Sequence, residues 1–257
     1  MISKYILSFS FIVSLVGAPV VAQDNVINDV LPPVIMDVLT EPSILPDVKM
    51  HKNTHPEKIL FTQLKLSKKQ ANVDGFSKVS PFVKQAQDID KSAMILSEYN
   101  RISNAFNMHE EKDHIVVKVN LETDEYSSLQ NLIVFDELDD KTFFKFKMYE
   151  ENVGIVPEDV KKYSKLQLSK ALAERMFQGL GGSSNVVAEF ILKPVYADRK
   201  EPFMMGTSTF WMMFARVAEF RLWSDKDSED AKLLWFHRSD WYSPEDNSNI
   251  GELFVKE

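Results

Sequence analysis

Two histidine pairs carry side chains of the type that binds metal ions. His51 and His55 are four residues apart, whereas His109 and His114 are five apart. A helical zinc site needs two histidines four apart on one face, with a glutamate between them. A spacing of five turns the second pair about 140° apart on a helix, and Pro56 disfavours a stable helix around the first pair. We therefore predict no metal site, with weak copper or zinc binding at His51 and His55 as the alternative.

Two pairs of adjacent methionines, Met204-Met205 and Met212-Met213, raise the question of a thioether copper site. Neighbouring side chains on a strand point to opposite faces, which would separate the members of each pair. Because methionine adapts well to irregular gaps, we expect these residues to fill core space.

Three glycines, Gly179, Gly181 and Gly182, follow a segment with helical character. Phosphate-binding loops have the opposite order, since they follow a strand and open a helix. Glycine readily adopts the left-handed conformation that ends a helix. The glycines therefore predict the end of a helix.

Signatures of common enzymes are missing from the sequence. It contains no G-x-S-x-G elbow, no S-x-x-K motif and no EF-hand spacing in the acidic segment 136–140. The chain has no cysteine, which excludes thiol nucleophiles, thiolate metal sites and disulfides. We predict no catalytic residues and no cofactor. A hydrolase whose acids are dispersed in the sequence stays an alternative, because such pairs come from distant segments.

Aromatic residues near the C-terminal end are the main candidates for binding. All four tryptophans lie beyond residue 203, at positions 211, 223, 235 and 241. Most of these aromatic residues alternate with polar ones as in a sheet, but Trp241-Tyr242 falls outside this alternation. Aromatic side chains are enriched in recognition surfaces. We predict that Trp241, Tyr242 and Trp235 contact a partner or a ligand.

The first 22 residues predict export. Lys4 provides a positive start, residues 5–16 are apolar and uncharged, and Val20-Val21-Ala22 forms a cleavage site before Gln23. This order is typical of a secretory signal peptide, and the apolar segment is short for a membrane span. We expect a periplasmic or secreted protein that begins at Gln23.

Cleavage there leaves an acidic chain. It removes one basic residue, so that 29 Lys and Arg remain against 38 Asp and Glu, a net charge of −9 with His neutral. An acidic surface repels phosphate backbones and anionic lipid. Charged residues also interrupt the most apolar later stretch, 203–223. We expect a soluble protein without a membrane span, which binds no nucleic acid and whose partner is another exported or envelope protein.

Residues 23–80 predict a Pro-rich and polar tether. Prolines recur at positions 32, 33, 42, 46 and 56, and each removes a backbone donor. Short apolar pieces, Val34-Ile35-Met36 and Ile44-Leu45, lie between them. Either this segment is a semi-extended linker, or its apolar pieces dock into a groove or onto a sheet edge of a partner.

The remaining residues, 81–257, predict a single α+β domain. Helical spacing extends over 81–106, with a wide apolar face suited to a sheet. Helical character returns over 157–178, with a later start capped by Ser164 or Ser169 as the alternative. Alternation and β-forming residues predict strands at 114–121, 132–135, 142–149, 186–196 and 232–238. Segment 210–223 fits a strand or a helix, and we favour a strand. Several strands with few helices between them favour helices packed on a largely antiparallel sheet.

Three functions remain open from the sequence. The leading hypothesis is an exported, non-enzymatic interaction or assembly module, because export and an acidic surface accompany the missing catalytic signatures. The second is a domain that binds a small molecule, sugar or peptide in an aromatic pocket formed by residues 203–242. The third is the hydrolase with dispersed acidic residues.

Overall fold

The computed structural model describes residues 39, 45–123, 126–181, 184–224 and 231–243. The predicted signal peptide and residues 23–38 and 40–44 of the predicted tether lie outside these residues. Among the residues described, no helix is both long and apolar enough to cross a membrane.

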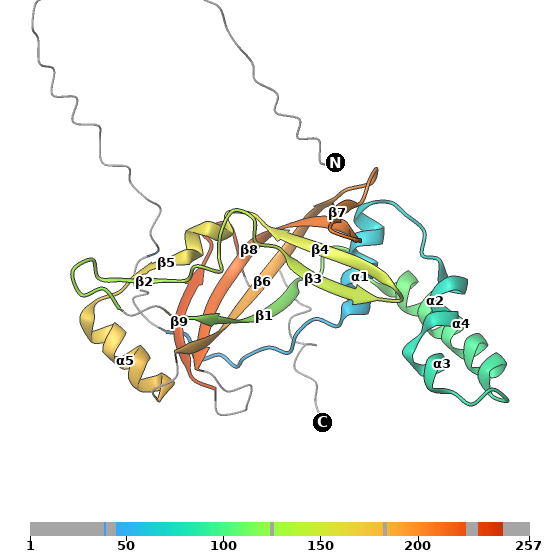
Figure 1. Ribbon diagram of the computed structural model, residues 1–257, viewed down its shortest axis with the longest axis horizontal. Coiled ribbons are helices and arrows are strands. Elements are labelled where there is room, and N and C mark those ends of the chain that lie inside the picture. Colours follow the sequence, from blue (N-terminus) through green and yellow to red (C-terminus); the bar gives the residue numbers. More distant parts are fainter. Residues whose placement is uncertain (1–38, 40–44, 124–125, 182–183, 225–230, 244–257) are drawn as a thin grey trace, which may run out of the picture. The chain divides into compact units, whose positions relative to one another are not determined.

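A mixed sheet forms the centre of the described chain (Figure 1). Its strand order is β1–β6–β8–β4–β3, and β7 and β9 also pair with β8. The strands are β1 (Ile115–Glu122), β3 (Phe144–Met148), β4 (Glu151–Pro157), β6 (Asn185–Ala197), β7 (Phe203–Met205), β8 (Ser208–Ser224) and β9 (Leu233–Arg238). The only parallel pairing among these strands is that of β4 with β8. The α+β class is therefore confirmed.

The long strand β8 connects the parts of this sheet. One edge pairs with β6, and the opposite edge pairs first with β4 and then with β9. The start of β8 forms a hairpin with β7, closed by Gly206 at a φ of 61°. This sharing requires 17 residues of extended backbone. The segment that fitted both a strand and a helix is thus a strand, because pairing with β4, β6, β7 and β9 fixes its backbone hydrogen bonds.

Helix α1 (Pro56–Leu66) covers the sheet and contacts β3, β4, β6 and β8. Its side chains Ile59, Leu60 and Phe61 are fully or almost fully buried. Pro56 occupies the first helical turn, where a missing N–H costs nothing, and thus starts a helix here. The predicted tether up to residue 80 differs from the structure at this point, because α1 belongs to the core.

The expected helix over 81–106 is divided into two. Helix α2 (Val73–Val79) precedes α3 (Pro81–Gln85), and α4 (Lys91–Met108) follows after an extended residue, Ala86. Helix α4 packs mainly on α2 and α3. Ile102 and Phe106 are buried, whereas Leu96 is 64% exposed. The prediction that the whole apolar face packs on the sheet is therefore wrong.

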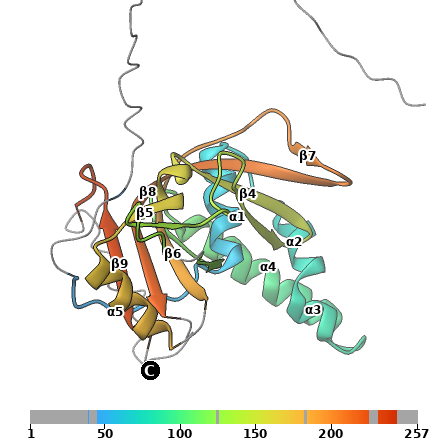
Figure 2. The ribbon, with the colours of Figure 1, turned by 60° about the vertical axis from the view of Figure 1, so that its left-hand side comes forward.

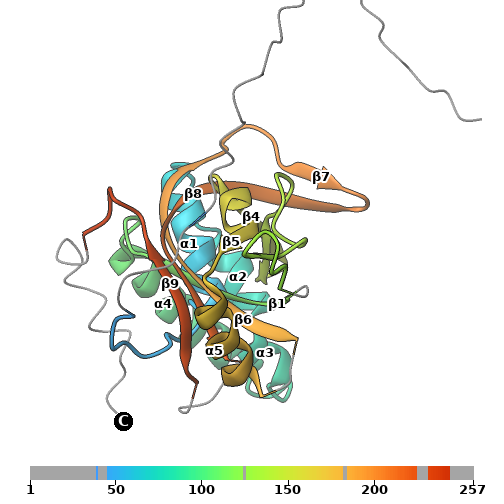
Figure 3. The same ribbon diagram turned by 90° about the vertical axis from the view of Figure 1, so that its left-hand side faces the viewer.

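Helix α5 (Lys170–Leu180) lies beside β9 (Figure 3). Ser169 caps its start, and Gly181 ends it with a φ of 61°, as predicted for a helix-terminating glycine. The segment before it is not the expected helix. It forms a short 3₁₀ turn, Val160–Ser164, and then β5 (Lys165–Gln167), which pairs with β2 (Leu132–Val134).

Candidate functional site

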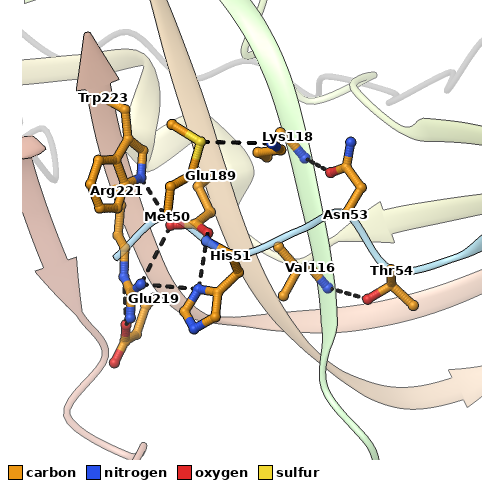
Figure 4. A network of polar contacts seen from close by, with 10 residues as sticks. All are labelled: Met50, His51, Asn53, Thr54, Val116, Lys118, Glu189, Glu219, Arg221 and Trp223. Carbon is orange, nitrogen blue, oxygen red and sulfur yellow. Dashed lines mark hydrogen bonds and ion pairs between the residues drawn. The ribbon is translucent and has the colours of Figure 1, made fainter. Parts of the chain in front are cut away.

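A network of buried charged residues lies where the described segment before α1, residues 45–55, meets β6 and β8 (Figure 4). We call residues 45–55 the N-terminal segment. Glu189 of β6 is fully buried. Its Oε1 accepts hydrogen bonds from the backbone N and the ring Nδ1 of His51, at 2.6 and 2.9 Å. Its Oε2 accepts from Trp223 Nε1 at 2.9 Å and forms an ion pair with Arg221 at 3.4 Å. Every carboxylate oxygen is thus occupied by the protein itself.

The charge of Arg221 is shared with a second carboxylate. Glu219 Oε2 accepts from the Arg221 guanidinium, and Glu219 Oε1 accepts from Arg238 Nε at 2.8 Å. Burial by itself would raise the pKa of the Glu189 carboxyl, but the His51 hydrogen bonds and the Arg221 charge outweigh it and lower that pKa. Glu189 is therefore held ionised, and Arg221 pairs with both Glu189 and Glu219.

The same N-terminal segment also bonds to β1. Thr54 N donates to Val116 O at 2.9 Å, and Val116 N donates to Thr54 Oγ1 at 2.8 Å. The Lys118 backbone N donates to Asn53 Oδ1 at 2.7 Å. Residues 51–54 are thereby fastened to three strands, which makes the network a structural latch. Charged residues in otherwise apolar strands were its only signal in the sequence.

A second ion cluster ties α1 and α4 to the turn after β3. Arg101 pairs with Glu98 and Glu57 at 2.9 and 3.0 Å, and Tyr149 OH donates to Glu57 Oε1 at 2.8 Å. Ser80 Oγ donates to Glu98 Oε2 at 2.6 Å. The hydrogen bonds that Arg101 donates to Glu98 are the main cause that raises the pKa of Arg101. Each carboxylate has an arginine partner, so this cluster too is structural.

The histidines examined as metal ligands do not converge. Among the residues described, no three His, Asp or Glu side chains form a group that could hold a metal ion. His51 belongs to the latch, and His55 caps α1. Burial lowers the pKa of His109 and of His114 to about 4. Both are therefore neutral at pH 7, His109 against the Thr62 hydroxyl at 2.8 Å.

The predicted aromatic binding residues lie in different environments. Trp235 is fully buried, with its ring centroid 5.7 Å from that of Phe220. Tyr242 is buried and packs at 5.4 Å from His114. Trp241 is 36% exposed, and Arg216 lies over its ring at 4.1 Å. Of the three, Trp241 alone presents a ring to solvent.

An exposed apolar surface lies instead on the hairpin of β7 and β8, which Figure 2 shows extending from the sheet. All three side chains of β7 are exposed, and Met204 is the most exposed at 67%. The last part of β6 adds two more exposed apolar side chains. We call this set the hairpin surface: Val195, Tyr196, Phe203, Met204 and Met205. The expectation that Met204 and Met205 fill the core is wrong, because β7 extends past the packed part of the sheet.

One described pocket lies between α5 and β9, with a volume of about 340 Å³. Five of its nine described lining residues are leucine or methionine, and none of the nine is acidic or aromatic. The lining residues are Leu45, Leu172, Arg175, Met176, Gln178, Gly179, Lys232, Leu233 and Leu234. We refer to it as the α5–β9 pocket.

Comparison with known proteins finds no matching family model, no matching curated protein and no matching solved structure.

Proposed function

We propose that the chain is an exported, non-enzymatic interaction module that binds another exported or envelope protein through the hairpin surface. The observation that carries this proposal is the exposure of every side chain of β7, all three of them large and apolar. Contiguous apolar side chains exposed on a protein surface favour a binding site for another protein. Methionine suits such a surface because it adapts its shape to a partner.

The backbone of β7 favours an extended segment as the bound element. Within the described chain, β7 pairs with β8 alone, so its outer edge offers unpaired N–H and C=O groups. A partner strand added to this edge would satisfy those groups. Its register decides whether its apolar side chains lie beside Phe203 and Met205 on one face or beside Met204 on the other. The hairpin lies at the start of β8, whereas Glu219 and Arg221 of the first ion cluster lie near its end.

The other functions have weaker support. An aromatic pocket in residues 203–242 would depend on Trp241, since Trp235 and Tyr242 are buried. A hydrolase needs facing acids that are free to react, whereas Glu189, Glu219, Glu57 and Glu98 all pair with arginine.

Export is tested by identifying the first residue of the expressed protein and the cell fraction in which it is found. The full chain, expressed with its leader, should be recovered outside the cytosol with Gln23 as its first residue. Protein that retains Met1 in a cytosolic fraction contradicts export, whatever the hairpin surface binds.

The binding part is tested by changing the hairpin surface alone. A variant with Phe203→Ser, Met204→Ser and Met205→Ser should lose a protein that co-purifies with the unchanged chain, while its thermal unfolding stays the same. Leu129→Ser is the matched control, because Leu129 is 96% exposed and lies outside this surface. A photo-crosslinking residue at position 204 should attach to the same protein. If the co-purifying protein survives the triple change, or if crosslinking captures only lipid, the hairpin surface is not the interface.

A further inference from the structure

We propose that the α5–β9 pocket binds a small aliphatic carboxylate. This site lies at the end of β8 next to β9, whereas the hairpin surface lies at its beginning (Figure 1). The two sites are therefore separate, and the pocket does not depend on the proposed protein partner.

The pocket walls match an aliphatic ligand. Leu172 and Met176 of α5 face Leu233 and Leu234 of β9 across it, and Leu45 of the N-terminal segment adds a further wall. A volume of about 340 Å³ falls within the range of small-ligand sites. Because burying each additional methylene group in such a lining is favourable, affinity should rise with chain length.

A glycine, Gly179, belongs to the lining of this pocket and packs against Leu234. A Cβ atom on Gly179 would approach Leu234 Cδ2 to 2.8 Å, which is closer than real contacts allow. A side chain at residue 179 would therefore have to displace the end of the Leu234 side chain, which itself lines the pocket.

The polar residues of the lining select the charge of the ligand. Arg175 and Lys232 bring two cations to the pocket, and neither side chain has an ion-pair partner among the described residues. The carboxylate nearest in sequence, Glu174, pairs with Lys170 at 3.9 Å. None of the described lining residues is acidic, so the pocket favours an anion, and the planar guanidinium of Arg175 suits a carboxylate.

The test measures binding of octanoate by calorimetry to the full mature chain, below the concentration at which octanoate forms micelles. Octylamine and 1-octanol have the same alkyl chain with opposite or no charge. We expect octanoate to bind, hexanoate to bind more weakly, and octylamine not to bind. In the variant with Arg175→Gln and Lys232→Gln, affinity for octanoate should fall at least about tenfold.

Two further variants distinguish binding at this pocket from nonspecific binding elsewhere on the protein. Lys170→Gln removes a cation from the same helix outside the pocket, and it should leave octanoate affinity unchanged. Leu233→Asp places a negative charge in the lining and should abolish octanoate binding. The proposal is overturned if the unchanged chain binds no octanoate, if octylamine binds equally well, or if the Arg175 and Lys232 changes have no more effect than Lys170→Gln.

Discussion

His51 and Glu189, 138 positions apart in the chain, meet through two hydrogen bonds to a single carboxylate oxygen, Glu189 Oε1. One bond comes from the backbone and one from the ring of His51, so both the position and the orientation of this residue are set. The contact is fully buried and includes the charge of Arg221. It attaches the segment before α1 to the middle of the sheet.

Loss of the Glu189 charge should strongly destabilise the protein. In Glu189→Ala, Arg221 remains buried with one carboxylate instead of two, and the His51 and Trp223 donors lose their acceptor. Removing one partner of a buried ion pair costs about 3–5 kcal/mol. Urea unfolding monitored by circular dichroism measures this loss. The exposed Glu174→Ala change should cost less than about 0.5 kcal/mol, and equal losses in the two variants would show that the latch is not needed.

Stability should fall as the pH decreases from 6.5 towards 4. The pKa of His109 and of His114 is lowered by burial to about 4 in the folded protein, against 6.5 as the ordinary value. The unfolded chain therefore binds more protons in this window, and each histidine contributes a slope of up to about 1.4 kcal/mol per pH unit. Unfolding free energies measured across the window test this slope.

Variants identify the histidines responsible for that slope. His109→Gln and His114→Gln should each flatten the pH dependence between pH 4 and 6.5. His55→Asn is the control, because His55 is exposed at the start of α1. A slope that persists in the double variant would assign the effect to other groups.

Helix α5 should depend on the glycine at its end. Gly181 has a φ of 61°, and a non-glycine residue in this left-handed conformation costs about 1–2 kcal/mol. No atom lies within 4 Å of the Cβ position, so the cost of Gly181→Ala comes from the backbone alone. Gly181→Asn should cost less, since asparagine tolerates this conformation. Thermal unfolding of both variants measures the difference, and equal stability of Ala and Gly would refute the assignment.

Trp241 provides a test of the aromatic binding residues. Its ring is partly exposed and stacks under Arg216, so Trp241→Ala should change overall stability by less than about 1 kcal/mol. If this residue contacts the partner, its replacement should reduce the yield of the co-purifying protein. Trp235→Phe probes the core instead and should lower stability without altering binding per folded molecule. Unchanged partner yield in Trp241→Ala would exclude this ring from the interface.

The sequence by itself determined the elements whose signals are local. Residues 186–196 include alternating apolar and charged side chains and form β6. Ser169 caps the start of α5, and Gly181 ends it. The strand at 232–238 is also present as β9. Such patterns depend on the period of the backbone and on conformations that one residue favours, so neighbouring residues are enough to reveal them.

The tertiary structure alone decided which residues are buried. Trp235 and Met204 are both large apolar residues on strands, yet one is in the core and the other faces solvent. Likewise, nothing near His51 in the sequence indicates that it pairs with Glu189. Burial and ion pairing depend on segments brought together from distant parts of the chain, and short-range periodicity contains no information about those contacts.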